Sequence, residues 1–225
     1  MRQQHYSISD STYTLNDERK HSVTRQDSKT SRVSLLSREA WSGGHYELSI
    51  LLGERDHDRA SSAVRVLWSY PLIDGPYASK QDLSETQHRV DPTEALERGL
   101  YGLASLTPEI RVPCGSTLIR FDDGPDWIQL YLPLGSISAF FRTGGFPFDK
   151  DHQRQKWEED LDSWLVGVAK HVFAQIRFEL ALVGFEVETA RFSKAKIRAS
   201  PLSERQFEGV LLPSEGQLKW FPPTN

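Results

Sequence analysis

The chain has 225 residues, of which 38% are hydrophobic and 26% are charged, and its formal net charge is -4 at pH 7. These values are typical of one globular domain with a buried core, and they exclude a strong electrostatic attraction to nucleic acid or to an anionic membrane. Cys114 is the only cysteine. It can form neither an intramolecular disulfide nor a thiolate zinc site, so we expect a reducing, cytoplasmic location.

The first 43 residues differ in composition from the rest of the chain. Ser, Thr, Arg, Lys and Asp dominate residues 16–38, and large apolar residues are sparse there. Such a segment buries too little apolar surface to fold alone, so we expect residues 1–43 to form a flexible leader without the apolar stretch of a signal peptide. Alternating residues at 6–9 leave a short edge strand as an alternative. Residues 44–225 are expected to form a single α+β domain.

The domain is predicted to begin with a strand and a helix. Residues 45–52 contain many large apolar side chains and end at Gly53, which indicates a strand. Apolar residues then recur at helical spacing over residues 56–70, with an aspartate available as the N-terminal cap and Pro71 as the stop. Residues 73–92 are polar and rich in turn formers, so we expect a loop there, with room for a short helix.

Two alternating segments around an acidic turn give the strongest local prediction. Residues 116–121 and 127–132 alternate between apolar and polar side chains, and the turn of residues 122–126 contains Asp, Gly and Pro. Strand alternation on both sides of an Asp-Gly turn predicts a β-hairpin. Residues 100–112 come before this hairpin and are expected to extend it into a meander, with a bend or bulge near Pro113 and Gly115.

The clearest helical pattern lies in the second half of the chain. Apolar residues recur at three- and four-residue steps over residues 154–176. A strand over residues 178–188 and a small hairpin over residues 209–221 are expected to follow. This order of elements predicts an α+β fold: a mostly antiparallel sheet with two helices packed on one face, which is a ferredoxin-like core with inserted strands.

The acidic turn is one candidate site. Asp122, Asp123 and Asp126 offer hard oxygen ligands for Mg²⁺ or Ca²⁺, and His57 or His152 would supply a further ligand or a proton. The geometry of the turn itself is the competing explanation, because hairpin turns select Asp, Gly and Pro for their own backbone angles. Neither histidine has a recognisable ligand spacing.

The outward face of the hairpin is the other candidate site. Strand alternation places Ile128, Leu130 and Leu132 opposite to Trp127 and Tyr131. With the first set in the core, Trp127 and Tyr131 are expected to form a partly exposed aromatic surface together with Arg120 on the facing strand. Such surfaces are enriched at protein interfaces. Coverage of these side chains by a loop or by the leader is the alternative. Phe146 and Phe148, in a later loop, are further binding candidates.

The sequence contains no Walker loop, no Gly-x-Gly-x-x-Gly pattern and no nucleophile elbow, and we expect no cofactor. Charged residues interrupt the most apolar long segment, 164–183, so we expect no membrane span. The leading hypothesis is a non-enzymatic protein-binding module, such as an immunity or antitoxin-like protein or an accessory subunit, with another protein as partner. The alternative is a metal-dependent hydrolase or phosphoesterase that uses the three aspartates. Small-molecule binding between sheet and helices is a third hypothesis.

Overall fold

The structure is a computed structural model that describes residues 36–83, 88–94, 96, 98–122, 124–143, 154–189 and 208–223. Three α-helices, two short 3-10 helices (η) and eight strands follow one another along this part of the chain: η1 (Glu39–Trp41), β1 (His45–Gly53), α2 (His57–Trp68), β2 (Ile73–Tyr77), η2 (Lys80–Leu83), β3 (Leu100–Ser105), β4 (Arg111–Arg120), β5 (Asp126–Pro133), α3 (Leu134–Ile137), α4 (Lys156–Gln175), β6 (Leu180–Phe185), β7 (Gly209–Ser214) and β8 (Gln217–Phe221).

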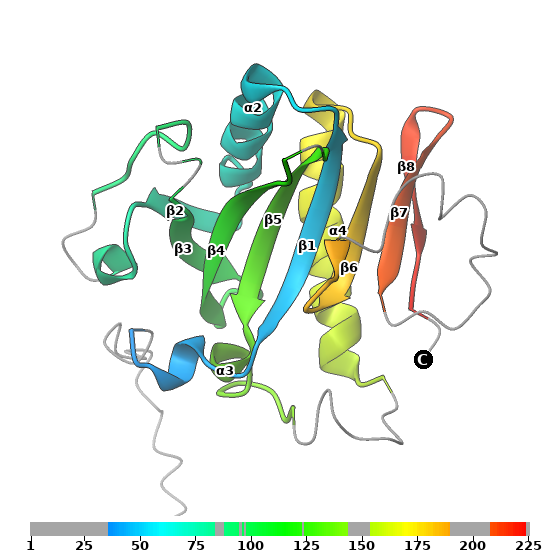
Figure 1. Ribbon diagram of the computed structural model, residues 1–225. Coiled ribbons are helices and arrows are strands. Elements are labelled where there is room, and N and C mark those ends of the chain that lie inside the picture. Colours follow the sequence, from blue (N-terminus) through cyan, green and yellow to red (C-terminus); the bar gives the residue numbers. More distant parts are fainter. Residues whose placement is uncertain are drawn as a thin grey trace, which may run out of the picture.

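All the strands belong to one antiparallel sheet with the order β2-β3-β4-β5-β1-β6-β7-β8 (Figure 1). The two central strands, β5 and β1, are therefore the ones farthest from either edge. The α+β class and the mostly antiparallel sheet predicted from the sequence are confirmed. None of the described helices is long and apolar enough to cross a membrane.

The main hydrophobic core lies between the sheet and the two long helices. Leu48, Ile50, Ile128 and Leu130 alternate along β1 and β5 and pack in one cluster with apolar residues of α2 and α4. Both helices begin where side chains satisfy free backbone N–H groups. Asp56 caps α2 by accepting from the N–H of Arg59 at 3.1 Å, and a capping box starts α4.

The opposite side of the sheet, which we call the second face, carries a separate apolar cluster. Neither α2 nor α4 lies on this side (Figure 1). Leu51, Trp127, Leu180, Leu182, Val187 and Val210 form this outer cluster, toward the β6–β7 part of the sheet. A smaller cluster of Tyr77, Leu83 and Leu103 lies toward the β2 edge, where Leu36 and Trp41 pack against it. The second face is thus partly buried at both ends.

The predicted strands and helices around the hairpin are confirmed. β4 and β5 pair in register from Gly115↔Tyr131 to Arg120↔Asp126, and β3 extends them into a meander. The sequence pattern also predicts the correct positions of strand β1, of helices α2 and α4 and of the β7–β8 hairpin. The predicted bend near Pro113 and Gly115 is wrong, because β4 continues through both residues without a register shift.

Two further predictions need correction at their ends. The segment predicted as a loop after residue 72 begins with an edge strand, β2, which contains Pro76; an edge position tolerates proline because the missing N–H would have faced outward. The last residues assigned to the leader contain η1, whose Trp41 ring stacks edge-on against Tyr101 with centroids 5.7 Å apart. Residues 1–35 lie outside the described part of the chain.

Candidate functional site

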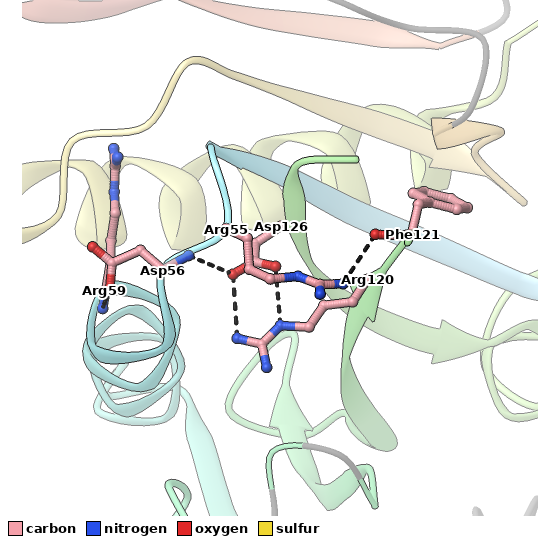
Figure 2. Close-up of polar contacts among 6 residues, drawn as sticks. All are labelled: Arg55, Asp56, Arg59, Arg120, Phe121 and Asp126. Carbon is pink, nitrogen blue, oxygen red and sulfur yellow. Dashed lines mark hydrogen bonds and ion pairs between the residues drawn. The ribbon is translucent and has the colours of Figure 1, made fainter. Parts of the chain in front are cut away.

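Asp126, the predicted metal ligand at the end of the acidic turn, is fully buried and bonded to protein groups (Figure 2). Its carboxylate accepts from Arg120 Nε at 3.0 Å and from the backbone N–H of Asp56 at 3.2 Å. Arg55 donates to the carbonyl of Phe121 at 3.0 Å, which adds a second link between the hairpin and the start of α2. These bonds attach the β4–β5 turn to the β1–α2 connection.

The three aspartates of the turn do not form a metal centre in the described residues. Asp126 is neutralised by Arg120, and Asp122 is exposed, while Asp123 lies outside the described residues together with His152. Across the part of the chain that the structure describes, no three His, Cys, Asp or Glu side chains converge as metal ligands would. The Arg120 guanidinium occupies the place where a metal ion would bind, so the charge of Asp126 serves to hold the fold together.

The predicted hairpin surface is only partly present. Trp127 and Tyr131 do lie on the second face, but Trp127 is only 1% exposed, because it packs into the outer cluster. Arg120 is not part of this surface: its register partner is Asp126, one residue before Trp127, and adjacent residues of a strand point to opposite faces. Phe146 and Phe148 lie outside the described residues. Tyr131 is the only one of these residues that the structure leaves half-buried on the second face.

Tyr131 belongs to a row of residues that crosses the second face at right angles to the strands. The register aligns Tyr77, Tyr101, Gly115, Tyr131 and Glu47 on five neighbouring strands. The ring of Tyr131 lies directly over Gly115: a Cβ atom there would fall 2.3 Å from the Tyr131 Cζ and Oη atoms. Glycine at this position therefore lets the Tyr131 ring lie across β4 toward Tyr101.

Two ring contacts and one cation extend this row into a continuous surface. His45 contacts the Tyr131 ring with centroids 4.7 Å apart, and Trp41 contacts the Tyr101 ring. The Lys80 Nζ lies 4.0 Å from the centre of the Trp41 ring and 5.6 Å from that of Tyr101. All these side chains are half-buried. We call His45, Tyr131, Tyr101, Trp41 and Lys80 the aromatic strip.

Next to the strip, the centre of the second face is polar and buried. Glu47 is 5% exposed and accepts a hydrogen bond of 2.5 Å from Gln129 Nε2 and another from the backbone N–H of Val187. Burial raises the pKa of its carboxyl to about 8, and the nearby charge of Glu186 acts in the same direction. Ser49, two residues further along β1, is fully buried, and its hydroxyl has no hydrogen-bond partner among the residues that the structure describes.

Burial also shifts the pKa values of two side chains next to Glu47. Burial lowers the pKa of His45 from its ordinary value and raises the pKa of Tyr131. Burial therefore disfavours the charged forms of His45 and Tyr131, as it does for Glu47. Cys114, on the core side of β4, is fully buried, and burial raises the pKa of its thiol, which disfavours a nucleophilic role.

Sequence reasoning found one member of the aromatic strip, Tyr131, and missed the rest. The composition of residues 1–43 predicts a leader that includes Trp41, and the turn formers of residues 73–92 predict a loop that includes Lys80. Local alternation does identify Tyr101 and Glu47 as residues of their strands, but only the pairing of β3, β4, β5 and β1 aligns them. The β1–β5 pairing joins Glu47 to Tyr131, 84 positions later in the chain, and short-range patterns do not encode such a contact.

No protein-family model, no curated protein and no solved structure matches the chain.

Proposed function

We propose that this chain is a non-enzymatic protein-binding module, of the immunity, antitoxin-like or accessory-subunit kind, and that it binds its partner through the aromatic strip. The observation that carries the proposal is the continuity of the strip: Lys80, Trp41, Tyr101, Tyr131 and His45 follow one another across a sheet face on which neither long helix lies. Tryptophan and tyrosine are among the side chains most enriched in binding hot spots.

The strip is also suited to binding because its rings are already held in place. Gly115 accommodates the Tyr131 ring, and Trp41 packs edge-on against Tyr101. Lys80 lies over the Trp41 and Tyr101 rings. Side chains fixed before association lose little conformational entropy when a partner binds, which increases the net affinity per contact. By contrast, the metal-dependent hydrolase hypothesis has no supporting geometry among the described residues, since Asp126 is bonded to Arg120.

The finer fold prediction, a ferredoxin-like core, is part of this proposal. The elements β1, α2, β4, β5, α4 and β6 follow the order of a split βαβ unit, and their strands lie in the sheet as β4-β5-β1-β6. The pair β2 and β3 is then an insertion after the first helix, and β7 and β8 are an extension at the other edge. Both helices contribute to one apolar cluster with the core strands, which supports their packing on a single face.

Copurification from the native host tests the proposal. The tagged wild-type chain is compared with a Tyr101→Ala/Tyr131→Ala variant, and bound proteins are quantified by mass spectrometry. We expect a specific partner to be recovered with the wild type and to fall by about tenfold or more with the variant, since two hot-spot residues cost about 2 kcal/mol or more together.

A matched control distinguishes a loss of partner binding caused by removal of the strip from one caused by removal of any exposed aromatic ring. Phe121 is 42% exposed at the far end of the hairpin and belongs to none of the apolar clusters. A Phe121→Ala variant should recover the partner as the wild type does, and circular dichroism should show that both variants fold. Equal recovery with the tyrosine variant and the wild type would reject the strip as the binding surface.

A further inference from the structure

Residues 186–189 fold back over the polar centre of the second face, and we call them the strap. The backbone of Glu186 has a φ of 44°, a left-handed turn that reverses the chain after β6, and its N–H donates to the His45 carbonyl at 2.9 Å. Val187 then packs into the outer cluster and donates its backbone N–H to Glu47, and Thr189 is buried as well. The strap therefore covers the Glu47 carboxyl.

The carboxyl under the strap is bonded only to neutral groups. Gln129 supplies an amide and Val187 a backbone N–H, and no ion pair of Glu47 exists among the described residues. The strap itself carries two further carboxylates, Glu186 and Glu188. A neutral carboxylic acid fits this environment, whereas a carboxylate would be buried without a cation among the described residues and would face the negative charge of Glu186.

We propose that the Glu47 carboxyl is a proton-operated latch: in its neutral form it permits the strap to close over the second face, and on ionisation it releases the strap. The groups that face Glu47 from the packed elements are His45 on β1, Tyr131 on β5 and Glu186 on the strap. Glu208 lies with its backbone and side chain over Gly184, the register partner of Glu47 on β6. Of these groups only His45 can carry a positive charge, and burial lowers its pKa, which disfavours the charged imidazolium.

The latch has a consequence for the aromatic strip. Tyr131 is the register partner of Glu47, and Gln129, which bonds Glu47, lies on the same strand two residues before Tyr131. Opening of the strap would admit water beside Tyr131, and the neighbouring Glu47 side chain would lose its bond to the strap. Partner binding should therefore weaken as the pH rises, a consequence that rests on the proposed function, whereas the latch itself does not.

Hydrogen exchange of the isolated chain tests the latch without any partner. The protection factor of the Val187 N–H, corrected for the intrinsic effect of pH, is measured between pH 5 and pH 9. Opening favours the ionised form, so protection should fall by up to about tenfold per pH unit from pH 5 and level off near pH 8. A Glu47→Gln variant, which keeps a side-chain acceptor for Gln129, should show no such fall.

Two additional measurements keep the outcome decisive. Carbon NMR of labelled glutamate in the wild type should show one carboxyl that titrates near pH 8. Glu186→Gln removes a nearby negative charge and should only lower the pH at which protection is lost, whereas Glu47→Gln should abolish the loss. Protection that is independent of pH in the wild type, or that falls equally in the Glu47→Gln variant, would overturn the latch. Neither result would bear on whether the strip binds a partner.

Discussion

Gly115 has its role because of the residue across from it. The Tyr131 ring occupies the space that a side chain on β4 would need, and this places the ring in the aromatic strip rather than upright on β5. Gly115→Ala should force the ring away and destabilise the fold by about 1–3 kcal/mol, as overpacking does in well-packed sites. Urea denaturation followed by circular dichroism measures this change.

A double-mutant cycle identifies the cause of that loss. In a Tyr131→Ala background the space over β4 is empty, so adding Gly115→Ala should cost much less than in the wild type, and the coupling should exceed about 0.5 kcal/mol. Additive effects would show that glycine is needed at this position for the backbone rather than for the ring.

At the scale of elements, one buried carboxylate attaches the β4–β5 hairpin to the start of α2. Asp126 accepts from Arg120 and from the Asp56 N–H, while the Arg120 side chain is only 20% exposed (Figure 2). Asp126→Asn keeps the shape but removes the buried negative charge that pairs with Arg120, and breaking such pairs costs about 3 kcal/mol. We expect Asp126→Asn to lower the free energy of unfolding by about 2–4 kcal/mol in urea titrations.

Asp122 offers the matched control in the same turn. Its side chain is exposed and takes part in none of the described ion pairs. Asp122→Asn should change the free energy of unfolding by less than about 0.5 kcal/mol, as exposed substitutions generally do. Similar losses for the two variants would contradict a specific structural role for Asp126.

The elements that the sequence predicted well are those that local patterns determine. Strand alternation and helical spacing located β1, α2, α4 and the β4–β5 hairpin, and of the two aspartates available as a cap for α2, Asp56 and Asp58, the structure shows Asp56. The edge strand β2 was missed because Gly75 and Pro76 are typical of turns, and its pairing with β3 is not visible in its own residues. Alternation also assigned Trp127 to the correct face, but it could not show that residues from β6 and β7 cover that face.

At the scale of the whole molecule, the second face combines three environments that no single segment contains. The aromatic strip lies over β3 to β5, the polar centre around Glu47 lies on β1 and β5, and the outer cluster extends over β6 and β7. The strap joins the last two, since Val187 packs in the outer cluster and bonds the carboxyl. Because Glu47 is bonded to groups from β5 and from the strap, its charge should influence the stability of the entire sheet.

The free energy of unfolding should therefore decrease as the pH rises through the range in which Glu47 ionises. Its carboxyl has a pKa of about 8 in the folded chain and about 4.3 in an unfolded one, so the folded state binds more protons between these values. The stabilisation is fully present below about pH 4 and is lost progressively up to about pH 8, at a rate of at most about 1.4 kcal/mol per pH unit. Glu47→Gln removes this dependence, and the variant should exceed the wild type in stability by about 2 kcal/mol or more at pH 8.5. Urea titrations of both proteins at a series of pH values measure the difference, and parallel curves for the two would show that Glu47 has an ordinary pKa in the folded state.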